Sequence, residues 1–175
     1  MRISADDSTS WEWIRSGDRE AFGNFYRQHA ASLRRFVVRS VGDPKAAEDI
    51  VQEAFLQLWQ HPDGFNPARG QLRAYLFGIA ARRSADWWRH KPAEAALKPE
   101  VPDNQHCSPM LVEDAFEKLD ADSRGLLWLR EVEGYSYQEL AEMLAIPVGT
   151  VRSRLYTARE RLRRVWKGEE NKEVL

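Results

Sequence analysis

A stretch with four prolines, between two segments patterned for helices, constrains the fold of this 175-residue chain more than any other feature. It runs from Pro92 to Pro109, holds no aromatic residue and shows no sustained apolar period. Because proline cannot continue a helix and proline-rich segments stay extended, the stretch predicts a linker. We therefore expect two small domains, residues 1–92 and 112–175, joined by a linker at 93–111.

Residues 1–92, here called the N-terminal module, are predicted to be entirely helical because their apolar residues recur at three- and four-residue spacing. Asp18 and Asp43 are predicted N-caps, since an aspartate oxygen can accept hydrogen bonds from the free amides of the first turn. Pro44 suits the first helical position after the second cap. The expected helices cover about 8–15, 19–42, 44–61 and 71–91.

Residues 112–175, the C-terminal module, carry the same kind of signal. A helix is expected at 120–133, and Ser136 with Glu139 matches a capping box, in which two side chains satisfy free backbone amides reciprocally. Another helix is expected over 147–167. With no β-hairpin signal in either module, the predicted fold class is all-α, with two small helical domains joined by a Pro-rich linker.

The net charge of −1 hides a strong segregation of charge. Residues 112–146 hold nine acidic and three basic groups, whereas 147–167 hold seven basic groups and one acidic. A basic helix of this length suits a nucleic-acid partner, although charge alone also fits a solvated helix.

The segment 136–164 has the spacing of a helix-turn-helix. Ala141 lets two helices approach, Ile146 closes the turn, and Val151 and Leu155 anchor the second helix. The opposite face of that helix carries side chains suited to DNA bases and phosphates: Arg152, Ser153, Tyr156, Thr157, Arg159 and Arg163. The alternative is a basic helical hairpin that packs on an acidic partner.

The sequence LREVEGYSYQELAEMLAIPVGTVRSRLYTARERLRR, from Leu129 to Arg164, closely resembles region 4 of the extracytoplasmic-function (ECF) sigma factors of bacterial RNA polymerase. The motif PVGTVRSRL is especially typical. In that family the second helix reads the minus-35 promoter element, so the resemblance assigns this role to Arg152, Ser153, Tyr156 and Arg159. Thr157 and Arg163, on the same face, complete the predicted minus-35 set. Many members carry arginine at the position of Thr157.

The sequence DPKAAEDIVQEAFLQLW, from Asp43 to Trp59, resembles region 2.2 of the same family, which docks on the clamp coiled coil of the largest polymerase subunits. Helical periodicity predicts that its core positions are Ile50, Val51, Ala54, Phe55 and Leu58. The opposite face is acidic and amide-rich with one leucine. The resemblance implies that this face binds core polymerase through Asp49, Gln52, Glu53, Leu56, Gln57 and Gln60. A solvated helix face is the alternative.

The segment from Phe65 to Lys91 resembles regions 2.3 and 2.4, which open the promoter and hold the minus-10 element. Its interleaved arginines and rings suit this task, because aromatic faces hold unstacked bases and basic groups follow the phosphates. The predicted minus-10 contacts are Phe65, Asn66, Arg69, Arg73, Arg82, Arg83, Trp88 and Arg89. The first three lie in a loop and are the candidates for a flipped-base pocket. Many members carry asparagine at the position of Arg82.

No catalytic, cofactor or metal site is predicted. The four histidines are scattered, and the pair His106–Cys107 supplies only two ligands. The first residues have no apolar signal-peptide core, and no apolar run is long enough to span a membrane, so a cytoplasmic protein is expected. Because no catalytic constellation is found, the protein is not expected to be an enzyme.

The resemblance implies three partners: core RNA polymerase, promoter DNA and an anti-sigma factor. It implies a sigma factor that directs polymerase to specific promoters and helps to melt the DNA, either as a monomer or held by its inhibitor. The acidic part of the C-terminal module is expected to discourage DNA binding by the free protein. Two alternatives remain open: a stand-alone helix-turn-helix regulator, which would bind duplex DNA without polymerase, and a helical adaptor with no DNA dependence.

Overall fold

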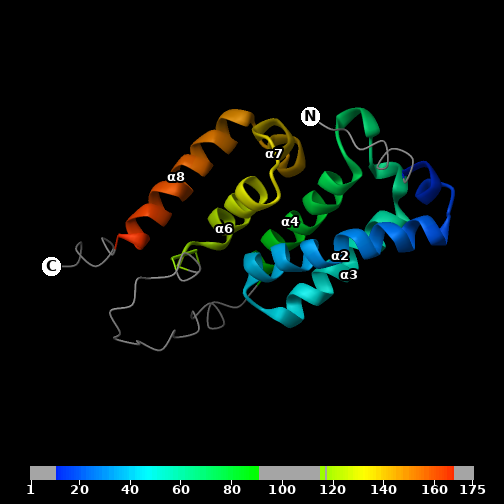
Figure 1. Cartoon of the computed structure of the whole chain (residues 1–175), viewed down its shortest axis with the longest axis horizontal. Helices are drawn as coiled ribbons and strands as arrows, with labels where there is room; N and C mark the ends of the chain where they lie inside the picture. Colours follow the sequence, from blue (N-terminus) through cyan, green and yellow to red (C-terminus); the bar gives the residue numbers. More distant parts are fainter. Residues whose placement is uncertain (1–10, 91–114, 117, 168–175) are drawn as a thin grey trace.

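The computed structural model describes residues 11–90, 115–116 and 118–167, and every regular element in them is helical. This confirms the all-α class. The predicted linker and the pair His106–Cys107 lie outside these residues. None of the described helices is both long enough and apolar enough to cross a bilayer. After a helical turn at 11–15, the elements are α2 (Arg19–Val41), α3 (Pro44–Gln60), η1 (Pro62–Gly64), η2 (Pro67–Arg69), α4 (Leu72–His90), α6 (Ala121–Leu127), η4 (Trp128–Val132), α7 (Tyr137–Leu144) and α8 (Val148–Trp166) (Figure 1).

In the N-terminal module, α2, α3 and α4 pack on one another. Both predicted caps are confirmed: Asp18 accepts hydrogen bonds from two amides of the first turn of α2, and Asp43 does the same for α3. Gly42 ends α2 in the left-handed conformation (φ 72°), which glycine adopts without a steric penalty. These local signals set the length and orientation of the helices that carry the candidate site.

In the C-terminal module, the helix expected at 120–133 begins as α6 and continues as a π-helical stretch, η4. The predicted capping box of Ser136 and Glu139 is present at the start of α7. The helix-turn-helix is closed by Ala145, a non-glycine residue in the left-handed region (φ 54°, ψ 42°). That conformation costs an L-residue about 1–2 kcal/mol.

The apolar core continues from one module into the other. The ring of Phe77 in α4 lies 5.9 Å from that of Tyr135, and the helix pairs α2–α6 and α4–α7 are in contact. Figure 1 shows α6 and α7 alongside α4. The linker interpretation left the separation of the modules open, whereas here they pack directly. The division into two domains stays a prediction.

His29 of α2 is buried, with only 7% of its surface exposed. Its ring meets that of Phe25 edge-on, with the ring centres 4.5 Å apart, and its Nε2 has no hydrogen-bond partner among the described residues. Burial, together with the positive charge of Arg73, lowers the pKa of His29 to about 4. The imidazole is therefore neutral at physiological pH.

Candidate functional site

The two faces of α3 are arranged as its periodicity predicts. All five predicted core residues are buried. On the opposite face the predicted polymerase-binding residues are exposed, except for the half-buried Gln57. Leu56 is the apolar centre of this face, with 44% of its surface exposed. We call the six residues Asp49, Gln52, Glu53, Leu56, Gln57 and Gln60 the outer α3 face.

A neighbouring ring extends the apolar part of this surface. Tyr26 of α2 is 45% exposed and lies 4.6 Å from the ring of Phe55. A groove of about 610 Å³ between α2 and α3 is lined by Tyr26, Phe55 and Leu56, among others. The sequence analysis did not identify Tyr26 as part of this surface, because its place beside α3 could be seen only after the two helices were packed.

The loop residues predicted to hold a flipped base come together at one end of α4. Asn66 caps η2 by accepting a hydrogen bond from the amide of Ala68, and Arg69 is exposed. Phe65 is buried, with its ring 5.1 Å from Trp11 and 5.6 Å from Tyr75. Phe65 therefore forms the wall of a pocket rather than an open stacking ring.

This pocket, of about 450 Å³, is shared between the modules. Phe65, Asn66 and Arg69 line it from the loop, while Glu139 and Glu142 line it from α7. We call it the loop pocket. Two carboxylates of the C-terminal module thus face the residues that were predicted to hold DNA.

Two of the arginines predicted to contact the minus-10 element bind residues of the other module. Arg73 forms an ion pair with Glu133, whose side chain is only 6% exposed, and its guanidinium lies 5.3 Å from the ring centre of Tyr135. Arg82 donates a hydrogen bond to the carbonyl of Met143 at 3.1 Å. Both partners belong to the C-terminal module.

Arg83 instead binds within its own module. It pairs with Glu53 and donates a hydrogen bond to the side chain of Gln57 at 3.1 Å. Both partners belong to the outer α3 face. A predicted DNA contact therefore holds two predicted polymerase contacts in place.

Two further predicted minus-10 contacts lie at the end of α4. Trp88 is half-buried and donates from Nε1 to the carbonyl of Ser40 at 3.0 Å. Its ring meets that of Trp87 edge-on at 5.0 Å. Arg89 is exposed and pairs with Asp86 one turn earlier.

Helix α8 presents the predicted minus-35 side chains as its spacing suggested. Its anchors Val151 and Leu155 are fully buried. Tyr156 is 67% exposed. The other exposed members of the set are Arg152, Ser153, Thr157 and Arg163, of which the last pairs with Glu160 on the same helix.

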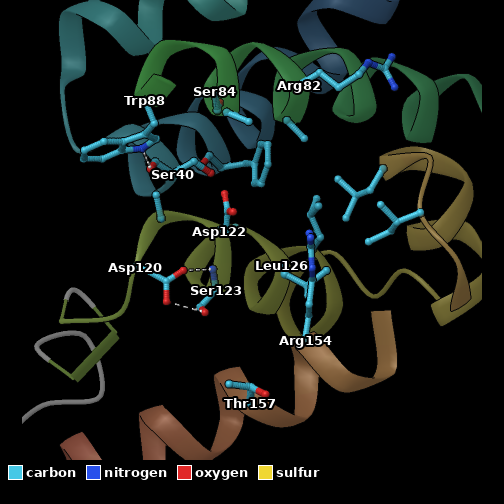
Figure 2. A pocket seen from close by; sticks show the side chains of 18 of the residues that line it. Ser40, Arg82, Ser84, Trp88, Asp120, Asp122, Ser123, Leu126, Arg154 and Thr157 are labelled. Carbon is cyan, nitrogen blue, oxygen red and sulfur yellow. Dashed lines mark hydrogen bonds between the residues drawn. The ribbon is translucent and has the colours of Figure 1, made fainter. Parts of the chain in front are cut away.

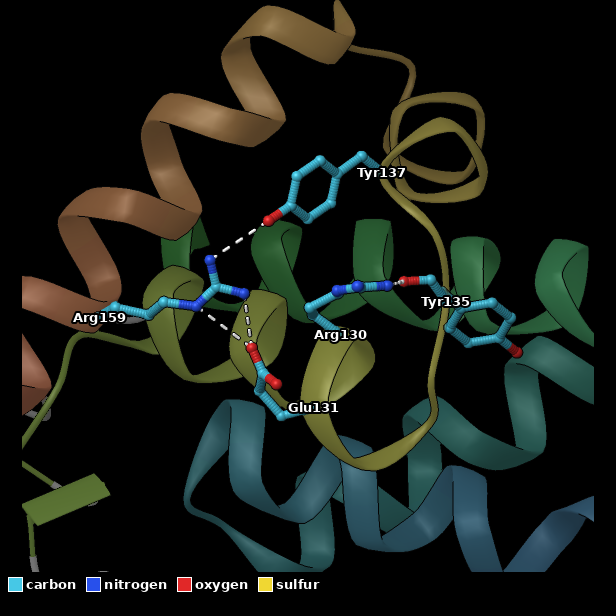
Figure 3. A network of polar contacts seen from close by, with 5 residues as sticks. All are labelled: Arg130, Glu131, Tyr135, Tyr137 and Arg159. Carbon is cyan, nitrogen blue, oxygen red and sulfur yellow. Dashed lines mark hydrogen bonds and ion pairs between the residues drawn. The ribbon is translucent and has the colours of Figure 1, made fainter.

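Arg159 differs from the other members of this set. It forms an ion pair with Glu131 of η4 at 2.7 Å and donates a hydrogen bond to the hydroxyl of Tyr137 at 3.2 Å (Figure 3). These contacts raise the pKa of Arg159, and the hydrogen bond from Arg159 lowers the pKa of Tyr137. In this structure Arg159 ties α8 to η4 and α7.

A cavity of about 480 Å³ separates α4 from α8 (Figure 2). Arg82 lines it from α4, and Ser153 and Thr157 line it from α8. Figure 2 shows Arg154 extending from α8 toward the N-terminal module. We call this space the intermodule cavity, because residues predicted to contact the two promoter elements meet across it.

The start of α6 closes one side of the intermodule cavity. Asp120 caps the helix, accepts a hydrogen bond from the hydroxyl of Ser123 and pairs with Arg161 of α8. Burial alone would raise the pKa of Asp120, but the hydrogen bonds from Ser123 and the nearby guanidinium lower it below its usual value. Across the described part of the chain, no three His, Cys, Asp or Glu side chains gather as a metal site.

Comparison with known proteins identifies both modules. Residues 25–93 match the family described as Sigma-70 region 2, and residues 110–162 match Sigma-70, region 4. The ECF RNA polymerase sigma factor SigL of Mycobacterium tuberculosis is 35% identical over 149 residues, which cover 79% of this chain and 84% of SigL. The ECF RNA polymerase sigma factor SigW of Bacillus subtilis is 28% identical over 172 residues, covering 86% and 91% of the two chains.

Solved structures agree with these matches. The structure of CnrH in complex with the cytosolic domain of CnrY superposes with a TM-score of 0.71 at 29% identity, covering 93% of this chain and 98% of that one. The sigma factor RpoE of Bartonella quintana, in complex with the anti-sigma factor NepR, gives a TM-score of 0.67 at 25% identity and covers 83% and 96%. The chain therefore belongs to the ECF family of RNA polymerase sigma factors.

Proposed function

We propose that this chain binds core RNA polymerase, directs it to specific promoters and helps to melt the DNA. The observation that carries the proposal is the outer α3 face: an exposed leucine within an acidic, amide-rich stripe, on a helix whose other side is fully buried. Leu56 and the exposed ring of Tyr26 line the same groove, and an apolar patch rimmed by polar groups is typical of a protein-docking site.

The DNA-binding half of the proposal rests on α4 and α8. The loop pocket and the arginines of α4 would hold the unstacked non-template strand at the minus-10 element. The exposed side chains of α8 would enter the major groove at the minus-35 element. Because one chain carries both surfaces, binding at one element raises the effective concentration at the other, so neither contact need be strong alone.

We also propose that an anti-sigma factor controls the chain in the cytoplasm, where its polymerase partner works. The proposal is supported by similarity to RpoE of Bartonella quintana, which was solved in complex with the anti-sigma factor NepR. CnrH, which is also similar, was solved in complex with the cytosolic domain of CnrY. A stand-alone helix-turn-helix regulator is the competing function, and the outer α3 face argues against it because such a regulator needs no second docking surface.

Reconstitution with purified core polymerase tests the proposal. The full chain should co-elute with the core enzyme, and the mixture should make promoter DNA from upstream of its own gene sensitive to permanganate. If the chain failed to co-elute and bound the duplex tightly alone, the stand-alone regulator would replace the sigma factor as the proposed function.

A further inference from the structure

The intermodule cavity has the size and the setting of a small-molecule site. Its volume of about 480 Å³ falls within the roughly 300–1,000 Å³ of typical ligand pockets, which often lie where two domains meet. Residues of α2, α4, α6 and α8 all contribute to its wall (Figure 2). The bulky apolar side chains in this wall are Phe36, Leu126, Leu129, Leu144 and Ile146.

The apolar wall favours an occupant with an apolar body. Water beside aliphatic and phenyl side chains finds no hydrogen-bond partners there, so replacing it with hydrocarbon or an aromatic ring is favourable. Trp88 also lines the cavity, and its Nε1 already donates to the carbonyl of Ser40 at 3.0 Å. The indole therefore offers an occupant its ring surface and no hydrogen-bond donor.

Arg154 brings an unmatched positive charge to the cavity. It extends from α8 toward the N-terminal module (Figure 2), and it has no hydrogen-bond or ion-pair partner among the residues that the structure describes. The other two lining arginines are engaged, since Arg161 pairs with Asp120 and Arg82 donates to the carbonyl of Met143. A guanidinium can bind a carboxylate or a phosphate through two parallel hydrogen bonds. Arg154 is therefore the lining group best able to hold an anion.

Another part of the wall presents hydrogen-bond acceptors. Ser40 and Ser84 are each 4% exposed, and both hydroxyls donate to a carbonyl one turn earlier in their own helix, at 2.9 Å. Their oxygens can therefore only accept a further bond. Asp122 adds a carboxylate, which in Figure 2 extends toward the N-terminal module on the same side as Ser40. Because like charges repel, an anionic head group is directed away from Asp122 and toward Arg154.

We propose that the intermodule cavity binds a small amphiphile, whose apolar body lies against the wall that includes Phe36 and Leu129 and whose single negatively charged head group is held by Arg154. The site shares no residue with the outer α3 face, so it goes beyond the proposed function. Ser153 and Thr157 of the predicted minus-35 set line the same cavity. An occupant would therefore lie against the helix that is proposed to read DNA.

Three full-length variants test the site. Arg154→Ala removes the charge that would hold the head group. Ala85→Leu puts a larger side chain into the wall, since Ala85 lines the cavity from α4. The matched control is Arg164→Ala, because Arg164 is also an exposed arginine of α8 but does not line the cavity. Helical content by circular dichroism would verify that all three variants fold.

The measurement is the binding of anilinonaphthalene sulfonate, an apolar fluorophore with one negative charge, by fluorescence titration at fixed ionic strength without polymerase or DNA. We expect Arg154→Ala and Ala85→Leu each to weaken its binding about tenfold, and Arg164→Ala to change it by less than about twofold. Decanoate should displace the fluorophore from the parent. Decyltrimethylammonium, with the same chain length and the opposite charge, should not displace it at the same concentration.

Equal affinity in the parent and in Arg154→Ala would overturn the proposal, as would the same loss in Arg164→Ala, which would show an effect of net charge alone. Equal displacement by the two amphiphiles would also overturn it, and a parent that binds no fluorophore would leave the cavity to water. These outcomes are distinguishable from failure of the proposed function, which is judged by the parent chain's co-elution with core polymerase and its opening of the promoter.

Discussion

The outer α3 face and the surfaces of α4 and α8 that carry the predicted DNA contacts differ in how available they are. The outer α3 face is open to solvent, and its only described link to another element is that of Glu53 and Gln57 with Arg83. On the other surfaces, Arg73 and Arg82 already bind the opposite module. The comparison teaches that one predicted binding surface is open to solvent in this arrangement, whereas part of the other is already bound to the opposite module.

Acid should have the largest effect, because it protonates the buried His29. The pKa of His29 is about 4 in the folded chain and near 6.5 when unfolded. Between these values the unfolded chain binds more protons, so this stabilisation is complete above pH 6.5 and is lost as pH falls to 4. The loss is about 3 kcal/mol in total. Urea unfolding across this pH range measures it.

His29→Leu is the control for the acid prediction, because a leucine at this position cannot take up a proton. Its unfolding free energy should fall less between pH 6.5 and 5 than that of the parent. Equal slopes in the two proteins would show that His29 does not carry the effect.

A charge placed on the outer α3 face should weaken the binding of this chain to core polymerase. Leu56→Asp puts a carboxylate at the apolar centre of the face, and we expect about 30-fold weaker binding to core polymerase, or about 2 kcal/mol. Val132→Asp is the matched control, since Val132 is also an exposed apolar residue, at 58%, but lies in η4. Equal losses in both variants would remove the distinction between the two surfaces.

Alanine substitutions of Arg159 and Arg152 should distinguish a structural contact from a proposed DNA contact on α8. Arg159→Ala removes the ion pair with Glu131 and the hydrogen bond to Tyr137, and should lower the unfolding free energy by up to about 1 kcal/mol. Arg152→Ala should change it by less than about 0.5 kcal/mol, because Arg152 is exposed. Chemical denaturation of the two variants decides between these roles. A larger loss in Arg152→Ala would reverse the assignment.

The last expected effect is a gain in stability, of a size similar to the loss in Arg159→Ala. Ala145→Gly relieves the left-handed conformation at the turn of the helix-turn-helix, and should raise the unfolding free energy by about 1 kcal/mol. The exposed position of Ala145 means that little packing is lost. Differential scanning calorimetry should show a higher melting temperature; a lower one would mean that the methyl group of Ala145 makes a necessary contact.

Local chemistry made the helices predictable. Asp18, Asp43 and Ser136 cap the helices that their positions predicted, because a cap depends only on the next three residues. The two faces of α3 could also be assigned, since burial there follows the period of a single helix. Sequence reasoning succeeded wherever the determining contacts lie within one or two turns.

The partners of exposed positions could not be predicted in the same way. Arg73 and Glu133 are 60 residues apart, and a helical period says nothing about which module will cover an outward-facing side chain. The intervening proline-rich stretch carries no pattern that sets the relative placement of the modules. Phe65 shows the same limit, because its burial depends on Trp11 and Tyr75 from two other segments. Gly78 and Gly125, which lie within helices at close contacts, are local signs of a close approach that the sequence analysis did not use.

The continuity of the apolar core has a consequence for how the chain unfolds. Phe77 and Tyr135 belong to one buried cluster although they come from different modules. Unfolding either module would expose apolar surface of the other, which couples their transitions. A calorimetric scan should then show one cooperative transition in place of two, so that a chain divided in its sequence behaves as a single thermodynamic unit.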